Sequence, residues 1–276
     1  MTVLVGVRCT DGIVIGADSA ATSAAGQQPM VRLPTDKLAI IGGKVIVAGS
    51  GAVGLGQRFQ AFVQNAWDQG LFNDVAMNCT LNLASSVVAN FKATHVPLSS
   101  QMGWGYGALL AAPFGDGPAL AEFGQIDFQP ELKLGKLHFV TMGSGQVLAD
   151  PFIAFISRVL WGGEAPDVRN ALFGVYWALQ HTIDCAPGGV GKPIRLATLQ
   201  QVQGEWMARA IEEDELQEPA QHIAEIEKRI AAYPAEVFAD ATVEPPPQPP
   251  PIANDTVLAR TTSRPGAGPA ILPSRS

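Results

Sequence analysis

Charged residues are scarce in this chain. Aspartate, glutamate, lysine and arginine make up only 16% of its 276 residues, and hydrophobic residues make up 47%. Soluble domains usually carry about a quarter of charged residues, so this composition favours an oligomer that buries surface beyond the core of each subunit. The net charge of −7 argues against nucleic acid as a partner.

Cysteines and long apolar runs are also few. The three cysteines, Cys9, Cys79 and Cys185, lie far apart and fit neither a disulfide framework nor a zinc site. The N-terminus lacks the basic segment and apolar run of a signal peptide, and no apolar stretch is long enough to span a bilayer. These absences predict a cytoplasmic protein with no membrane partner, no metal ion and no cofactor.

Motifs built on histidine or on nucleotide binding do not occur either. None of the four histidines belongs to a convincing local pattern with serine or cysteine, and no P-loop is present. Any energy for unfolding a protein substrate would therefore have to come from a partner ATPase, whose identity the sequence does not indicate.

Valine-rich runs separated by turn residues predict strands near the N-terminus. Asp11-Gly12 and Gly42-Gly43 are dipeptides that tight hairpins prefer, whereas residues 19–34 are typical of a loop. From about residue 55 the apolar spacing changes to the helical period. Strands are predicted over 2–9, 13–18, 37–41, 44–48, 106–112, within 118–128, and over 137–141, 193–199 and 205–210; helices are predicted over 55–67, 81–91, 147–161, 167–183 and 220–232.

This order of elements predicts an α+β fold. Two antiparallel sheets flanked by helices would bury every apolar face in a four-layer αββα sandwich. The composition changes after Tyr233, and the proline-rich run 245–251 is typical of polyproline II. We therefore expect one folded domain over residues 1–232 and a disordered proline-rich tail over residues 233–276.

Thr2 directly follows Met1, which makes it a candidate nucleophile. If Met1 is removed, Thr2 carries both a hydroxyl and a free α-amine. An α-amine with a reference pKa of about 7.7–8.0 can act as the base that activates the hydroxyl. The alternative is that Thr2 only opens a strand, as a small β-branched residue does.

An ordered set of motifs resembles the proteasome β-subunit and its simpler bacterial relative, the HslV peptidase. Thr2, Asp18, Lys37 and Gly49, each in its local motif, follow the order of that family, in which an N-terminal threonine attacks a peptide carbonyl. The resemblance covers roughly residues 2–210. It implies the fold of the N-terminal-nucleophile (Ntn) hydrolases and the activity of a threonine-type endopeptidase.

The resemblance also implies a role for each of these residues. Lys37 would keep the amine of Thr2 neutral and stabilise its alkoxide, and Asp18 would offset the burial of the Lys37 charge. The backbone N–H of Gly49 would donate to the oxyanion of the tetrahedral intermediate.

Two later positions match the family as well. Ser144, in a Gly-Ser-Gly turn, resembles the serine that hydrogen-bonds the active-site cluster, and Asp184 resembles the aspartate that supports that serine. The family usually carries a serine three residues after this aspartate, where this chain has Pro187, which lacks a hydroxyl and a backbone N–H. This departure, the longer loop before Lys37 and the proline-rich tail point to a stand-alone bacterial proteasome homologue, of the betaproteobacterial or the Anbu type.

The resemblance further implies a substrate pocket and an assembly. Ala21, Val47 and Gly51 would line the pocket, which would accept neutral, apolar side chains before the cleaved bond because none of the three is charged. Peptides or unfolded proteins would be cleaved inside a closed homo-oligomeric ring, expected to be double. Two alternatives stay open: an Ntn amidohydrolase that acts on a small amide, and a catalytically silent ring protein that keeps the fold as a scaffold.

Overall fold

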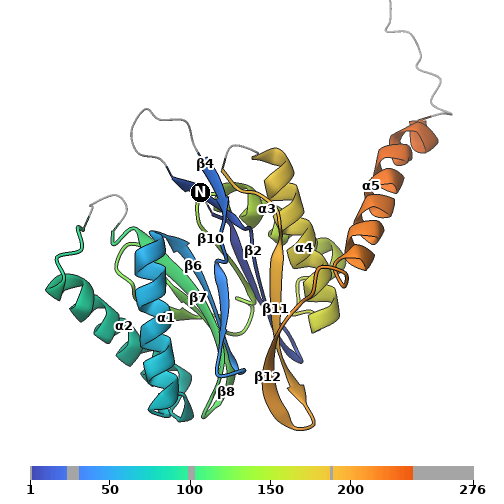
Figure 1. Cartoon of the computed structure of the whole chain (residues 1–276). Helices are drawn as coiled ribbons and strands as arrows, with labels where there is room; N and C mark the ends of the chain where they lie inside the picture. The colour runs from blue at the N-terminus through green and yellow to red at the C-terminus, as the bar shows by residue number, and fades with distance from the viewer. Residues whose placement is uncertain (1, 24–30, 99–102, 187–188, 239–276) are drawn as a thin grey trace, which may run out of the picture. The chain divides into compact units, whose positions relative to one another are not determined.

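The computed structural model of the chain describes residues 2–23, 31–98, 103–186 and 189–238. The chain divides into two compact units, Met1–Ile230 and Ala231–Ser276. The first unit has an α+β structure built on two five-stranded antiparallel sheets, with helices on their outer faces (Figure 1). None of the described helices combines the length and the apolar character that a bilayer crossing needs.

The first sheet contains the N-terminal strand and has the order β10-β1-β2-β11-β12. Strand β1 pairs with β2 through the Asp11-Gly12 hairpin and with β10 on its other side, so that Leu4 lies opposite both Ala17 and Met142. This register brings the end of β2 and the end of β10 to Thr2. The strands are β1 Leu4–Arg8, β2 Gly12–Ala17, β10 Phe139–Met142, β11 Arg195–Val202 and β12 Glu205–Ala210.

The second sheet runs in chain order, β5-β6-β7-β8-β9. Its side chains alternate between two faces, as the pleat of a strand requires. In β6, Val45 and Val47 belong to the core under the helices, while Ile46 and Ala48 belong to the core between the sheets. The strands are β5 Leu38–Ile41, β6 Val45–Gly51, β7 Tyr106–Phe114, β8 Gly117–Phe123 and β9 Pro130–Leu132.

The two sheets pack face to face. Leu4 and Ile15 from the first sheet share one buried cluster with Ile46 and Leu109 from the second. The absence of a side chain at Gly6 permits this close packing, since a Cβ there would lie 3.2 Å from a methyl group of Leu120. At one edge the sheets are also joined by a hydrogen bond, which the backbone N–H of Ala208 donates to the carbonyl of Gly43 over 2.8 Å.

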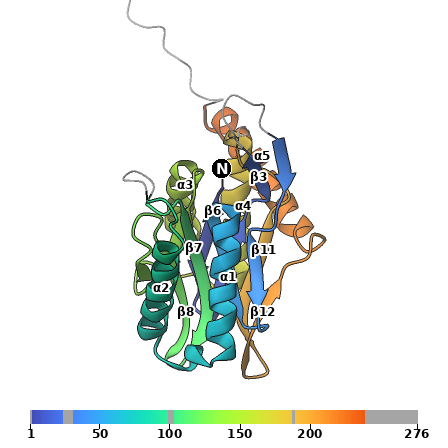
Figure 2. The ribbon, with the colours of Figure 1, turned by 60° about the vertical axis from the view of Figure 1, so that its left-hand side comes forward.

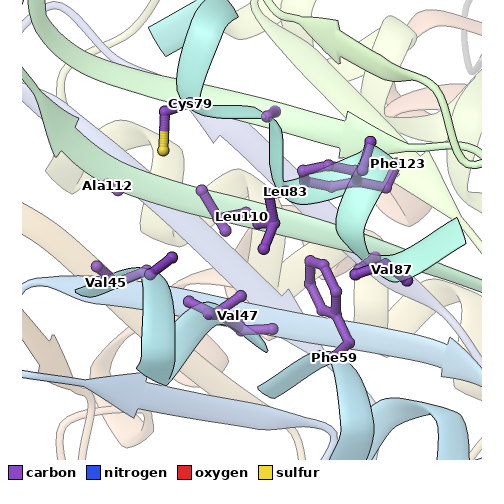
Figure 3. Packing of buried hydrophobic residues seen from close by; sticks show 14 of the residues in the cluster. Val45, Val47, Phe59, Cys79, Leu83, Val87, Leu110, Ala112 and Phe123 are labelled. Carbon is purple, nitrogen blue, oxygen red and sulfur yellow. The ribbon is translucent and has the colours of Figure 1, made fainter. Parts of the chain in front are cut away.

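Two layers of helices cover the outer faces of the sheets. Helices α1 and α2 pack on the second sheet, where Phe59 and Val87 meet Val47 (Figures 1 to 3). Helices α3 and α4 and the first half of α5 pack on the first sheet, where Ile153 and Val175 meet Val5. Helix, sheet, sheet and helix therefore follow one another as layers. The helices are α1 Val53–Asp68, η1 Leu71–Asn73, α2 Ala76–Ala93, α3 Gln146–Leu160, α4 Val168–Cys185 and α5 Gln217–Phe238.

The structure differs from the sequence-based prediction in several places; strand β9 and the short helix η1, for example, were not predicted. The segment 19–34, predicted to be a loop, contains strands β3 Ala20–Ser23 and β4 Val31–Pro34, which form a sheet of their own. Helix α2 begins at Ala76, ahead of the predicted residue 81. Helix α5 runs past the predicted end at residue 232 to Phe238 and contains Pro234, and the two compact units divide within this helix, after Ile230. The predicted tail lies, from residue 239 onward, outside the described residues.

Candidate active site

Thr2 lies just before β1 and is held by the turn between β10 and α3. Its side chain and backbone are only 6% exposed, and its backbone nitrogen donates to Ser144 Oγ over 3.1 Å. Its carbonyl accepts from the N–H of Gly145 over 3.0 Å. Gly143 has a φ of +97°, and a Cβ there would lie 2.3 Å from the Thr2 carbonyl oxygen. The Gly-Ser-Gly turn therefore requires glycine at its first position to approach Thr2.

Asp18 is the buried acceptor at the centre of the site. It is fully buried and follows the last residue of β2, one position beyond the pairing of Ala17 with Leu4. Its Oδ1 accepts from Lys37 Nζ over 2.6 Å and from the N–H of Val3 over 2.9 Å. Its Oδ2 accepts from the N–H groups of Ala20 and Gly191, each over 3.1 Å. Four donors thus compensate this carboxylate for the loss of water.

Lys37 is the cation of the site. Its side chain is 8% exposed and forms an ion pair with Asp18. Burial lowers the pKa of the Lys37 ammonium below its usual value, and the charge and hydrogen bond of Asp18 oppose this effect without cancelling it. Lys37 therefore lies in an environment that weakens its hold on the proton, and while it is protonated its charge disfavours protonation of nearby groups.

Gly49 lies beside Lys37, but its N–H group does not match the role predicted for it. The backbone N–H of Gly49 donates to the carbonyl of Lys37 over 3.0 Å. This bond continues the pairing of β5 with β6 by one residue beyond Leu38 and Ala48. The Gly49 N–H, which was predicted to bind a substrate oxyanion, is thus used in strand pairing in this structure.

Asp184 is also not placed as predicted. Its carboxylate is exposed on the last turn of α4, and Gln180 Nε2 donates to its two oxygens over 2.7 Å. Among the residues that the structure describes, no hydrogen bond joins Asp184 to Ser144. Pro187, the departure from the family pattern, lies outside the described residues. The serine therefore contacts Thr2 without the predicted support from this aspartate.

A cavity of about 630 Å³ opens beside Thr2, a size within the range of small-ligand sites. Gly51 lines it, as predicted for a substrate-binding residue. Val47 does not, because its side chain is buried between the second sheet and the helices (Figure 3), and that part of the prediction is wrong. For Ala21 only the backbone in β3 is described. The lining residues are Thr2, Ala20, Thr35, Asp36, Lys37, Gly49, Ser50, Gly51, Val53, Gly56, Gln57, Gln60, Gly105, Tyr106, Gln125, Gly143 and Ser144.

Comparison of the chain with known proteins does not assign it to a family. No protein-family model matches the sequence, and no curated protein shows significant similarity to it. The resemblance to the proteasome β-subunit therefore rests on the ordered motifs described above.

Sequence reasoning missed the residues that form the far wall of the cavity. Gln57 and Gln60 come from α1, and Tyr106 comes from the first position of β7, opposite Gly51. Nothing in the local sequence marks these residues, because they reach the cavity only through the packing of α1 and the pairing of β6 with β7.

The arrangement offers nucleophilic chemistry on one side of a cavity. A hydroxyl, a backbone nitrogen that becomes an α-amine when Met1 is lost, a buried cation and a serine hydroxyl gather around Thr2. Within the described residues, no group of three or more histidine, cysteine, aspartate or glutamate side chains is placed to hold a metal ion.

Proposed function

We propose that this protein is an Ntn hydrolase that cleaves peptide bonds with Thr2 as its nucleophile. The observation that carries the proposal is the environment of Thr2, whose nitrogen contacts Ser144 and which shares a cavity with the Lys37–Asp18 ion pair. A threonine that only opened a strand would not need a buried lysine charge in the same cavity, since such burial costs free energy.

The proposed reaction begins when the α-amine of Thr2 accepts the proton of its own hydroxyl. The oxygen attacks the substrate carbonyl, the carbonyl π electrons move to oxygen, and a tetrahedral intermediate forms. The intermediate collapses, the C–N bond breaks, and the α-amine passes its proton to the leaving nitrogen. Water then attacks the resulting ester, with the same amine as base, and releases the acid product and free Thr2.

Lys37 supports this reaction electrostatically. Its positive charge opposes protonation of the Thr2 amine and stabilises the alkoxide. Asp18 holds the ammonium in place through the 2.6 Å ion pair and is itself tied to the N–H of Val3, the neighbour of Thr2. The two residues therefore act as one unit that positions a cation beside the nucleophile.

Gly51 is the better candidate for the oxyanion donor. N–H groups of alternate residues in an antiparallel strand point to the same side, so the N–H of Gly51 is expected to point as that of Gly49 does, toward the β5 side of β6. Pairing with β5 ends before this position, and Gly51 lines the cavity. We expect its N–H to bind the carbonyl oxygen as negative charge develops there.

The same proposal includes a cytoplasmic location and an ATPase partner that is not identified. It also includes assembly into a closed ring, which we expect to be double. Helix α3 carries Val147, Phe155, Val159 and Leu160 as exposed apolar side chains. An apolar stripe of this kind on a described surface is typical of a contact between subunits. Closed rings of identical subunits use such contacts repeatedly.

The first test is mass spectrometry of the purified protein combined with peptide hydrolysis. We expect Met1 to be absent, an epoxyketone inhibitor to form an adduct with the Thr2 oxygen and nitrogen, and Thr2→Ala to abolish turnover because it deletes the hydroxyl. Thr2→Ser, which keeps hydroxyl and amine, should retain part of the activity and serves as the matched control. Undiminished turnover by Thr2→Ala would refute the assignment, and an unreactive protein with Met1 removed would favour the silent scaffold.

A further inference from the structure

Tyr106 places a phenol at the wall of the cavity. Its side chain is only 2% exposed although it is a lining residue. The ring stacks on Phe128 at a centroid distance of 6.1 Å and lies against Phe59 at 6.0 Å. Aromatic packing therefore fixes the direction of the C–O bond.

The hydroxyl end of this ring lies between two glycines of the cavity lining. A Cβ at Gly49 would lie 2.6 Å from Tyr106 Oη, and a Cβ at Gly56 would lie 3.7 Å from it. Both glycines line the cavity, so the missing side chains leave the oxygen next to the open volume. No described residue makes a hydrogen bond with Tyr106 Oη. Burial also raises the pKa of the Tyr106 phenol, which keeps it a neutral O–H donor.

Three glutamines add neutral amide groups to the lining of the same cavity. Gln57 and Gln60 belong to α1, and Gln125 donates to Ser50 Oγ over 3.3 Å. Among the described lining residues, Asp36 and Lys37 carry charge, and Asp18 balances the lysine. The cavity thus has a slight excess of negative charge, together with several neutral hydrogen-bonding groups.

We propose that Tyr106 determines the substrate specificity of this cavity by donating a hydrogen bond to a neutral amide side chain, such as that of glutamine or asparagine, immediately before the cleaved bond. This inference rests on the proposed threonine hydrolase and replaces the expectation of an apolar pocket. An apolar side chain would leave the buried phenol without a partner, which costs free energy. A carboxylate would be repelled by the excess negative charge of the cavity. An amide can accept a hydrogen bond from the phenol and donate one to the glutamines.

The test uses the full chain with Met1 removed and fluorogenic peptides that differ only in having glutamine, leucine or glutamate before the cleaved bond. We expect the highest kcat/KM for glutamine. Tyr106→Phe removes only the hydroxyl oxygen and should lower the glutamine-to-leucine ratio roughly tenfold, the usual effect of losing one buried hydrogen bond. Tyr176→Phe on α4, which makes the same change in the core on the other side of the molecule, is the matched control and should leave the ratio unchanged.

Binding of the same peptides to Thr2→Ala, measured by fluorescence anisotropy, separates the two proposals because it needs no hydrolysis. Glutamine-selective binding that Tyr106→Phe weakens, without turnover in the parent protein, would support the pocket and refute the hydrolase. Turnover that depends on Thr2 but prefers leucine, or responds equally to Tyr106→Phe for all three peptides, would overturn the pocket alone. Neither turnover nor glutamine-selective binding would overturn both.

Discussion

At the scale of a single residue, the pKa of Lys37 depends on its burial and on its ion pair. Its ammonium is nearly excluded from solvent, and its ion pair with the fully buried Asp18 is 2.6 Å long. Burial lowers its pKa below the usual 10.5, although Asp18 opposes this shift. The proposed mechanism needs Lys37 protonated and the Thr2 amine neutral, so both titrations should be visible in the pH dependence of activity.

We expect a bell-shaped plot of kcat/KM against pH. Activity should rise as the Thr2 amine, whose reference pKa is about 7.7–8.0, loses its proton, and fall below pH 10.5 as Lys37 loses its own. Lys37→Arg should remove the falling limb, because the pKa of arginine exceeds about 12, even if the different shape of its side chain lowers the maximum. The measurement is peptide hydrolysis from about pH 6 to about pH 11, which brackets both reference values.

Deprotonation of Lys37 would not produce this falling limb by unfolding the protein. The pKa of Lys37 is lower in the folded protein than in the unfolded chain. Between these two pKa values the unfolded chain binds more protons, so the contribution of Lys37 to the free energy of unfolding rises with pH in that range. Circular dichroism at each pH is the control. A falling limb at the same pH in Lys37→Arg would exclude Lys37 as its source.

At the scale of the elements, the turn between β10 and α3 connects the fold to the site. Strand β10 is paired with β1, and the turn that follows it carries both the glycine that approaches the Thr2 carbonyl and the serine that contacts the Thr2 nitrogen. The pairing of two strands far apart in the chain thus determines where the nucleophile lies.

We predict that Gly143→Ala lowers the free energy of unfolding by more than the roughly 1–3 kcal/mol that a strained backbone position costs, and that it also lowers activity. The new Cβ would lie 2.3 Å from the Thr2 oxygen and would push the turn away. Gly117→Ala is the control, because Gly117 has a comparable φ of +120° but a Cβ added there would meet no atom within 4 Å. Urea denaturation compares them; an equal loss in both variants would mean that the approach to Thr2 is not the cause.

At the scale of the whole molecule, low charge content and the exposed apolar side chains of α3 favour association. We predict a closed multimer by light scattering at micromolar concentration. Val159→Asp should lower the measured mass, because Val159 is 48% exposed on α3 and a charge in a subunit contact would be left unpaired. Val202→Asp, at a site 50% exposed at the end of β11, should leave the mass unchanged. A monomer in the unmodified protein would contradict the proposed ring.

The local sequence was enough to predict most strands and helices and several members of the site. Hairpin dipeptides and valine-rich runs mark β1, β2, β5 and β6, because turn geometry and alternation act over a few residues. The short strands β3 and β4 were missed, since their segment is rich in small and polar residues that also suit a loop. The order of Thr2, Asp18, Lys37 and Ser144 likewise comes from short motifs, and the structure brings these four residues together.

What only the tertiary structure decided is which groups face the cavity and which are already bonded. Val47 points to the helices, and the N–H of Gly49 bonds to Lys37. Tyr106 reaches the cavity because β7 pairs with β6 opposite Gly51. Each of these outcomes depends on strand register and helix packing between segments distant in the chain, and a one-residue shift in register would reverse the side to which a residue points.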